Sequence, residues 1–371
     1  MNHKSVYLHK IVTTVPEKYY TQDFALKYLL RLIRGNEEVE TFLKKIYKAT
    51  GIYKRHTVIA DYDKDPSEHI FYPKNSSLTP EPSTTQRNDL YIKESKRLSL
   101  IAGQKLFQGM PEFDKSKITH LITVSCTGVY TPGFDFFLAR DLQLDPGVHR
   151  FHIGFMGCHG AFPALKLAKN ICLSEPEARV LIVNVEICSI HFQQAFELDI
   201  MVANAIFADG VSAALVSPHK DDVKGSKFIL HNFVSRYTEG SEDDMGWTIG
   251  DHGFVMNLSV NVPRVLNNNI RPIAEELFKK AGITKDEIEI WAIHPGGKAI
   301  LEKVEQALQL TPDDLDASYH IMREYGNMSS ATIMFVFEHI LNSPAKKGLI
   351  FSATFGPGLT IESGLMEKIS G

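Results

Sequence analysis

Three chemically capable side chains stand at turns where strand-like runs meet helical ones. Cys158 lies on a glycine-flanked turn before an apolar helical stretch. A thiol at a helix N-terminus gains thiolate character from the partial positive charge there. His294 ends the strand-like run Ile288–Ile293, and Asn327 lies in a turn that opens another apolar helix. Each residue alone has an ordinary explanation: a buried thiol, a histidine that caps a turn, or an asparagine at a helix N-cap.

A cysteine, a histidine and an asparagine together suit one kind of acyl transfer. The thiolate attacks an acyl thioester and stores the acyl group covalently. A malonyl thioester that loses carbon dioxide supplies a carbanion, whose charge gathers on the thioester oxygen. N–H donors from histidine and asparagine stabilise that oxygen, and loss of one such donor typically costs about 10² to 10³ in rate. A cysteine hydrolase is the alternative; it would use the histidine as a proton shuttle and release a free acid.

The chain repeats itself, and the repeat gives these residues equivalent places. A Leu-Gln-Leu-x-Pro phrase begins at Leu142 and again at Leu308, each time ahead of the turn that carries the cysteine or the asparagine. The spacing from each of these two residues to the next strand-like run is also the same. Loosely recurrent units, common in α/β proteins, are the alternative. We predict two similar halves, residues 1–220 with the cysteine and residues 221–371 with the histidine and asparagine, facing a shared cleft.

Strand-like and helical runs alternate along most of the chain, which predicts an α/β fold with largely parallel sheet between helices. The strand-like runs are His120–Val124, Val180–Val185 and Ile288–Ile293. The helical runs are Leu165–Leu173, Pro272–Ala281 and Ala299–Leu310. The segment Asp61–Asn88 is rich in Pro, Ser, Thr and Asp and predicts a long surface excursion.

The composition is that of a soluble globular protein. Of 371 residues, 44% are hydrophobic and 23% charged, and a net charge of −4 gives no indication of nucleic-acid or membrane binding. No apolar run approaches the roughly 18 residues of a membrane span, and the polar segment Met1–Lys10 does not resemble a signal peptide. The four cysteines lack Cys-x-x-Cys spacing, which argues against disulfides and metal sites. We expect a cytoplasmic enzyme.

Three blocks of the sequence resemble the signature blocks of the type III polyketide synthases, the chalcone synthase-like family. They are Gly157-Cys158 before an alanine-rich helix, Trp291-Ala-Ile-His294-Pro-Gly-Gly297, and Tyr325-Gly-Asn327-Met-Ser-Ser330. The resemblance implies a duplicated thiolase fold with five layers (αβαβα), a homodimer, and an acyltransferase that extends an acyl-CoA starter with malonyl-CoA. Coenzyme A thioesters are then substrates, and no other cofactor is expected.

The resemblance also implies roles for individual residues. Cys158 is the nucleophile, with His294 and Asn327 as thiolate partner and enolate donors. Phe207 matches a phenylalanine beside the malonyl group, and Met256 stands where the family has a second gate phenylalanine. The other substrate-binding positions that it implies are Cys126, Thr131 (which reaches across the dimer), Cys188, His191, Gly296, Ser329, Phe355, Gly356 and Pro357.

Departures from the family pattern concern the pocket. Methionine is more flexible than phenylalanine, so the gate at Met256 is expected to be looser. Cys126, Cys188 and His191 stand where plant members often have threonine, which argues against a plant-like product. Three lysines fall where the family binds the coenzyme A phosphates, with a solvated basic face as the alternative: Lys44, Lys45 and Lys48.

Two other functions stay open. A ketoacyl-carrier-protein synthase III-like condensing enzyme would take malonyl groups from a carrier protein, although the His-Pro-Gly-Gly turn at His294 favours the polyketide synthase and no carrier protein is indicated. A catalytically silent scaffolding homologue would not need the cysteine, histidine and asparagine together. The starter acyl group, the number of extensions and the mode of ring closure depend on pocket volume, which the sequence does not fix.

Overall fold

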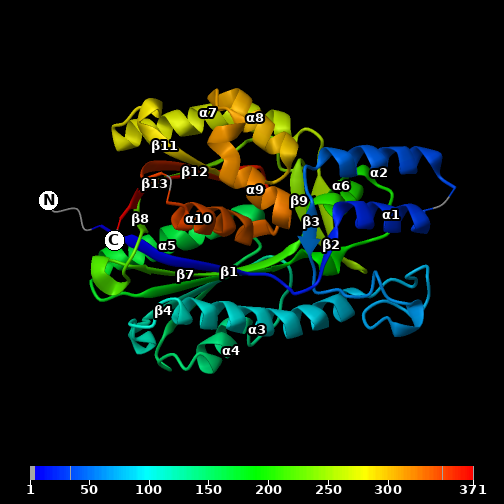
Figure 1. Ribbon diagram of the computed structural model, residues 1–371, viewed down its shortest axis with the longest axis horizontal. Helices are drawn as coiled ribbons and strands as arrows, with labels where there is room; N and C mark the ends of the chain where they lie inside the picture. The colour runs from blue at the N-terminus through cyan, green and yellow to red at the C-terminus, as the bar shows by residue number, and fades with distance from the viewer. Residues whose placement is uncertain (1–4, 34, 345, 371) are drawn as a thin grey trace.

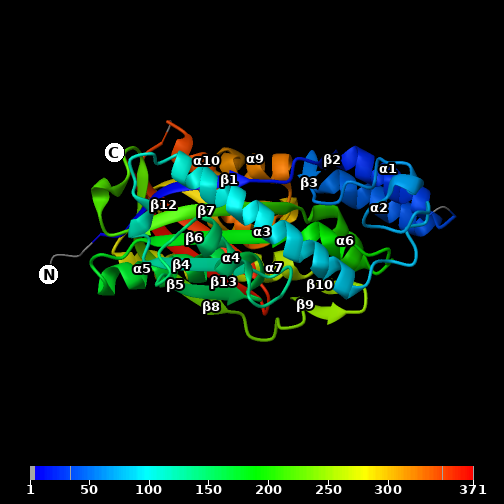
Figure 2. The same cartoon turned by 90° about the horizontal axis from the view of Figure 1, so that it is seen from below.

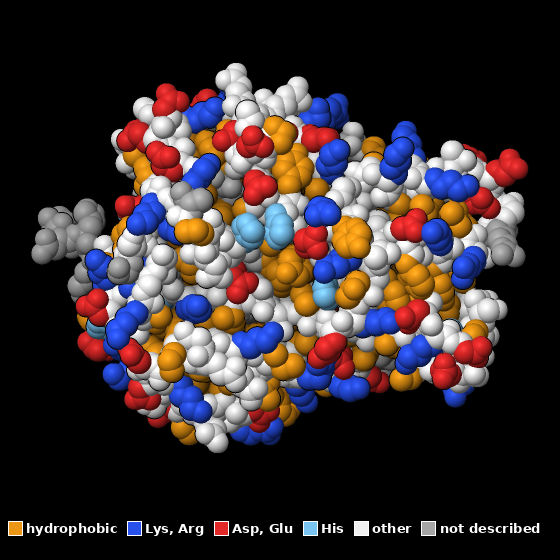
Figure 3. Space-filling view, in the orientation of Figure 1, with side chains coloured by type: hydrophobic (Ala, Val, Ile, Leu, Met, Phe, Trp, Pro, Cys, Tyr) orange, Lys and Arg blue, Asp and Glu red, His pale blue; other side chains and the backbone are white. Residues whose placement is uncertain are grey.

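The computed structural model describes residues 5–33, 35–344 and 346–370. The first four residues of the polar segment Met1–Lys10, and positions 34, 345 and 371 of the two predicted halves, lie outside the described residues. No helix within these three ranges is long and apolar enough to cross a membrane. On the face seen in Figure 3, acidic and basic side chains are interspersed.

The N-terminal part alternates strands and helices. Its strands are β1 (Tyr7–Thr14), β2 (Tyr19–Thr21), β3 (Lys54–His56), β4 (His120–Ser125), β5 (His149–Gly154), β6 (Val180–Ile187) and β7 (Asp209–Ser217). Its helices are α1 (Gln22–Leu32), α2 (Glu37–Ala49), α3 (Thr84–Gln108), α4 (Phe134–Asp141), α5 (Ala161–Ser174) and α6 (Leu198–Ile206).

The C-terminal part continues the alternation. Its strands are β8 (Lys227–Tyr237), β9 (Met245–Gly250), β10 (Gly253–Leu258), β11 (Ile288–Ile293), β12 (Gly348–Gly356) and β13 (Thr360–Ile369). Its helices are α7 (Val262–Ala281), α8 (Lys298–Leu308), α9 (Asp316–Tyr325) and α10 (Thr332–Asn342).

The sheet pairing repeats between the two parts. Strands follow one another in the order β4-β6-β7-β1 in the first part and β11-β12-β13-β8 in the second. In each set the first pair is parallel and the next two pairs are antiparallel. A short antiparallel bridge between β1 and β8 joins the sets edge to edge, and β5 extends the first set at its outer edge. Because order and direction agree strand for strand, the predicted duplication of the fold is confirmed.

Five layers are visible in the ribbon drawing. Helices α7 and α8 cover one outer face, α3 and α4 cover the opposite face, and α5 and α10 lie between the two sets of strands (Figures 1 and 2). The predicted α/β fold with αβαβα layering is therefore confirmed. The prediction of a largely parallel sheet is wrong: within the described residues, neighbouring strands of the large sheet form three parallel and five antiparallel pairs. The two central helices are the only layer covered by sheet on both sides, so their sequences are apolar nearly all round.

Observed boundaries differ from the predicted ones by a few residues at several helices. Helix α5 begins at Ala161, ahead of the predicted run Leu165–Leu173, because the 3₁₀ turn Gly157–His159 leads directly into it. Helix α7 begins at Val262, well before the predicted run, and Pro272 lies inside it. Short periodic windows mark the interior of a helix better than its ends.

The predicted surface excursion Asp61–Asn88 ends early and is partly buried. Ser83 and Gln86 form a capping box, in which the Ser83 N–H donates to Gln86 Oε1 and the Gln86 N–H donates to Ser83 Oγ, so α3 starts at Thr84. Tyr72 and Leu78 of this segment are buried and pack with Ile59. The segment therefore has a small core of its own.

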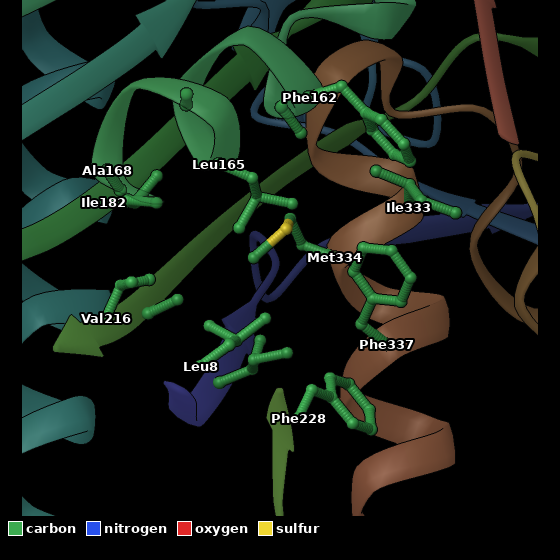
Figure 4. Close-up of a cluster of buried hydrophobic side chains, with 14 of the residues drawn as sticks. Leu8, Phe162, Leu165, Ala168, Ile182, Val216, Phe228, Ile333, Met334 and Phe337 are labelled. Carbon is green, nitrogen blue, oxygen red and sulfur yellow. The ribbon is translucent and has the colours of Figure 1, made fainter. Parts of the chain in front are cut away.

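The central layer forms the densest apolar core. Phe162 and Leu165 of α5 face Met334 and Phe337 of α10, with Leu8 of β1 close by (Figure 4). The rings of Phe162 and Phe337 have centroids 6.4 Å apart. This packing fixes α5 relative to α10.

We expect Phe337→Ala to lower the free energy of unfolding by about 3–5 kcal/mol, because truncating a buried phenylalanine loses its transfer free energy and leaves a cavity. Urea denaturation followed by far-UV circular dichroism measures this. Tyr237→Ala is the control: its side chain is 77% exposed, and the change should stay within about 0.5 kcal/mol. Equal losses in the two variants would contradict the assignment of the central layer as the core.

Candidate active site

One large cavity, of about 490 Å³, receives residues from both halves of the fold. It lies where β4, β6 and β11 end and where the turns before α5 and α10 begin. All but two of the catalytic and substrate-binding residues predicted from the sequence line it: Cys126, Cys158, Cys188, His191, Phe207, Met256, His294, Gly296, Asn327, Ser329, Phe355 and Pro357.

Two positive φ angles place Cys158 at the cavity. The chain leaves β5 through Phe155, with a φ of 60°, and Gly157, with a φ of 65°. A Cβ at Gly157 would stand 2.6 Å from Pro357 Cδ, so only glycine fits between this turn and the end of β12. The turn leads through Cys158 into α5, where the thiol is 8% exposed.

Asn327 reaches the same sulfur from the equivalent turn of the second half. Its Oδ1 and Nδ2 both lie 3.9 Å from Cys158 Sγ. Oδ1 accepts hydrogen bonds from the Ser329 N–H at 2.9 Å and from Thr332 Oγ1 at 3.3 Å. Because Oδ1 is engaged, Nδ2 is left to donate, and its contact with the Gly296 carbonyl oxygen is long, at 3.5 Å.

His294 is a buried histidine whose ring makes no hydrogen bond. It follows β11, its N–H donates to the Ala353 carbonyl oxygen, and the residue is 1% exposed. Among the described residues neither ring nitrogen has a partner. A buried polar group without a partner typically costs about 1–3 kcal/mol. A ring held in this state, in the cavity that Cys158 and Asn327 also line, is available to a substrate.

Burial keeps both the thiol and the imidazole neutral. It raises the pKa of Cys158 to about 11 and lowers the pKa of His294 to about 3. The sequence predicted instead that the pKa of this thiol is lowered, because Cys158 lies at a helix N-terminus. The helix dipole is worth only about 0.3–1 kcal/mol at exposed positions, whereas desolvation of a fully buried group shifts a pKa by up to 3–5 units. Desolvation therefore outweighs the helix dipole at Cys158.

Glu186, which was not predicted from the sequence, holds the cavity-lining residues Cys126 and Thr127 in place. It is fully buried, and burial raises its pKa to about 7. Its carboxylate accepts hydrogen bonds from the Cys126 N–H and Thr127 Oγ1, both at 3.1 Å, and from Ser330 Oγ. The Cys126 thiol lies 3.4 Å from the same carboxylate. The available signal was the one charged side chain in the mostly apolar strand β6.

Phe207 and Met256 line the cavity from two neighbouring elements. Phe207 ends α6 and forms a β-bridge with Asn327, in which the Asn327 N–H donates to Ile206 and the Ala208 N–H donates to Asn327. This bridge ties the phenylalanine to the catalytic turn. Met256 lies on β10 in the β9–β10 hairpin.

His191 is fixed in the wall by both of its ring nitrogens. Nε2–H donates to the Thr127 carbonyl oxygen at 2.8 Å, and Nδ1 accepts from the Phe254 N–H at 3.0 Å. Its ring stacks on Phe254 at 4.2 Å, and Phe254 stacks on Trp247 at 4.6 Å. Burial lowers the pKa of His191 to about 4, so this wall is uncharged near neutral pH.

Five predicted positions do not line the cavity. Thr131 is exposed on the loop before α4, and Gly356 lies between two lining residues, where a Cβ would stand 2.1 Å from His159 Nδ1. The remaining three lie on the exposed side of α2: Lys44, Lys45 and Lys48. Within the parts of the chain that the structure describes, no group of three or more His, Cys, Asp or Glu side chains is placed to hold a metal ion.

Comparisons with known proteins agree with this geometry. The N-terminal domain of the chalcone and stilbene synthases matches residues 2–219, and the C-terminal domain of the same family matches residues 230–370. PKS-I from the brown alga Ectocarpus siliculosus is 27% identical over 100% of both chains, with a TM-score of 0.89.

A second solved structure is the C-terminal type III polyketide synthase domain of Steely1, a type I/III hybrid from Dictyostelium. It is 26% identical, with a TM-score of 0.90, and the match covers 98% of this chain and 99% of that one. The chain therefore belongs to the family of chalcone and stilbene synthases and is a type III polyketide synthase.

Proposed function

We propose that this polyketide synthase loads an acyl group from acyl-CoA onto Cys158 and extends it by decarboxylative condensation with malonyl-CoA. One observation carries the proposal: a buried thiol, an imidazole with two unpartnered nitrogens and an oriented amide N–H line the same cavity. Donors that are already aimed at the site need no reorganisation when charge develops.

Loading transfers the acyl group from one sulfur to another. The Cys158 sulfur attacks the thioester carbonyl carbon while a ring nitrogen of His294 takes the thiol proton. The carbon–sulfur bond to coenzyme A then breaks, and the departing thiolate takes up that proton. Neutral Cys158 and neutral His294 suit this order, because proton transfer accompanies attack and no stored thiolate is needed.

Extension begins with loss of carbon dioxide from malonyl-CoA. The electron pair of the broken bond moves onto the thioester oxygen, where a His294 N–H and Asn327 Nδ2–H stabilise the enolate. The enolate carbon attacks the acyl group on Cys158, the sulfur leaves, and the product is a coenzyme A thioester longer by two carbons. Phe207 places an apolar face near the malonyl carboxylate, which favours the neutral carbon dioxide over the anion. No cofactor takes part in this sequence.

Positive charge near the cavity rim suits the phosphates of coenzyme A. Ile46 and Ala49 of α2 line the cavity, and three exposed side chains on the same helix carry charge close to them: Lys44, Lys45 and Lys48. Cytoplasmic pools of acyl-CoA and malonyl-CoA would supply both substrates.

We also infer a homodimer formed through β5. This strand is the outer edge of its sheet, so its free backbone groups can pair with a second copy. Large apolar side chains, each more than 40% exposed, surround it: Phe136, Phe151, Phe155 and Met156. Thr131, exposed on the nearby loop before α4, would then reach the partner's cavity.

The two half-reactions should separate by mutation. We expect Asn327→Ala to lower carbon dioxide release from malonyl-CoA by about 10² or more, because one enolate donor is lost. Acylation of Cys158 by acyl-CoA, followed by intact mass, should persist in that variant. Cys158→Ala should lose the acyl adduct, while Cys172→Ala should keep it, because Cys172 is buried inside α5 away from the cavity. Normal decarboxylation in both Asn327→Ala and His294→Ala would rule out the proposed mechanism.

The pH dependence of the alkylation rate should show that the Cys158 thiol is neutral near pH 7. Burial holds the pKa of Cys158 at about 11, above the ordinary value near 8.5. The rate of iodoacetamide modification, mapped to the Cys158 peptide, should therefore keep rising from pH 8 to pH 10. Cys158→Ala provides the background from the neighbouring thiols Cys126 and Cys188. A plateau near pH 6–7 would instead show a thiolate–imidazolium pair in the free enzyme.

The dimer proposal predicts that Phe151→Lys produces monomers, since a charge would be buried at the paired edge. Sedimentation velocity at micromolar concentration measures the change in mass. Ile70→Lys, on a side chain that is 82% exposed in the segment before α3, should leave the wild-type mass unchanged. A monomeric wild-type protein would end this proposal.

A further inference from the structure

The cavity extends well beyond the catalytic residues, toward helix α1. We call this part the α1 arm and define it by Phe24, Ala25, Tyr28, Leu29 and Tyr62, all of which line the cavity. Helix α1 lies at one end of the molecule, whereas the turn of Cys158 is at the central layer (Figures 1 and 2). A ligand that occupies both places must be extended.

Aromatic ring faces form one side of the α1 arm. Tyr20, Phe24 and Tyr28 follow one another at a spacing of four residues, and their rings stack with centroids 4.9 and 6.2 Å apart. Tyr62 packs edge-on against Tyr28 at 5.3 Å. The Tyr20 hydroxyl donates to Asp63, and the Tyr62 hydroxyl bonds to that of Tyr72. The polar ends of Tyr20 and Tyr62 are thus engaged by protein groups, and these rings and that of Phe24 present carbon.

The polar groups between the α1 arm and Cys158 are also engaged. The Arg55 guanidinium donates to Gln22 Oε1 and to the carbonyl oxygens of Asn204 and Phe207, at 2.8–3.0 Å. Thr50 Oγ1 donates to the Tyr47 carbonyl oxygen and accepts from Gln22 Nε2. A polar ligand group here would lose its water without gaining a free partner, which is unfavourable. Hydrocarbon carries no such penalty.

The cavity wall formed by His191, Phe254 and Trp247 offers no comparable extension. His191 is held by two hydrogen bonds and by the ring stack with Phe254 and Trp247. Displacing it would break both hydrogen bonds and leave buried polar atoms unpaired. A long substituent on Cys158 therefore has no room on this side, whereas the side toward α1 is lined by aromatic and aliphatic carbon.

We infer that the α1 arm binds the hydrocarbon tail of a long-chain fatty acyl group, carried in as the acyl-CoA starter and attached at Cys158. The inference rests on the proposed function and adds its substrate class. Each methylene that the arm buries contributes about 0.8 kcal/mol, which is about fourfold in kcat/KM. Aromatic and short acyl groups fill only the part of the cavity near the sulfur.

The test is a chain-length series with a variant that fills the arm. Wild-type kcat/KM with malonyl-CoA should rise from butyryl-CoA through hexanoyl- and decanoyl- to palmitoyl-CoA. Ala25→Phe should lower kcat/KM at least about tenfold for palmitoyl-CoA and no more than about twofold for hexanoyl- and benzoyl-CoA. Ala25→Leu, a smaller change, should shorten the preferred chain by fewer carbons and serves if the phenylalanine variant does not fold. Lys27→Phe adds the same ring on the exposed side of α1 and should change nothing.

Acylation of Cys158 by each acyl-CoA without malonyl-CoA, followed by intact mass, keeps this test separate from the condensation mechanism. Selective loss of palmitoyl loading in Ala25→Phe supports the inference even if no polyketide forms. An equal loss for every thioester in the folded variant would place the pantetheine portion of coenzyme A in the arm and overturn it. A flat chain-length profile in the wild type would overturn it as well.

Discussion

The approach of the N-terminal ends of α5 and α10 is the constraint on which the site depends. These helices lie back to back between two sets of strands, and the turns before them bring Cys158 and Asn327 within 3.9 Å. Neither helix can slide without opening the core that Phe162 and Phe337 fill. Duplication explains the symmetry, because each half contributes the same turn and the two turns meet.

Burial of the catalytic side chains is the second property that the fold imposes. Desolvation raises the pKa of Cys158 and lowers that of His294, so both groups are uncharged near neutral pH. The imidazole nitrogens stay unpaired at a cost that the large core offsets. Under the proposed mechanism, an enolate formed there would meet donors in a medium of low dielectric, where hydrogen bonds to charge are stronger than in water. The same burial would therefore strengthen the hydrogen bonds to the enolate and make the site locally less stable.

The chemistry and the choice of substrate are located in different parts of the fold. The reacting groups come from strand ends and central-helix turns, whose positions the sheets fix. The cavity walls come from outer elements: α1, α6 and the β9–β10 hairpin. Rings that stack on His191 close one wall, and rings on α1 line the other with carbon. Changes in these outer elements can alter the acyl group without touching Cys158.

The α/β class, the duplication and the convergence of Cys158, His294 and Asn327 could be predicted from the sequence alone. Those features follow from local signals, namely apolar periodicity and turn residues at matching spacings. The resemblance to the type III polyketide synthases also suggested most of the cavity positions. Thr131 is an exception: it is exposed on the loop before α4, and its predicted role depends on a dimer surface that no local sequence pattern describes.

The protonation state of the site and the shape of the cavity walls depend on tertiary contacts and could not be predicted from the sequence. Cys158 is neutral because of everything packed around it, not because of its place on a helix. Glu186 gains its partners from β4 and the turn before α10, and His191 gains its own from Thr127 and Phe254. The α1 arm needs α1 and Tyr62 to meet across a long stretch of chain. Desolvation and cavity shape are sums over contacts between residues distant in sequence, so no local pattern contains them.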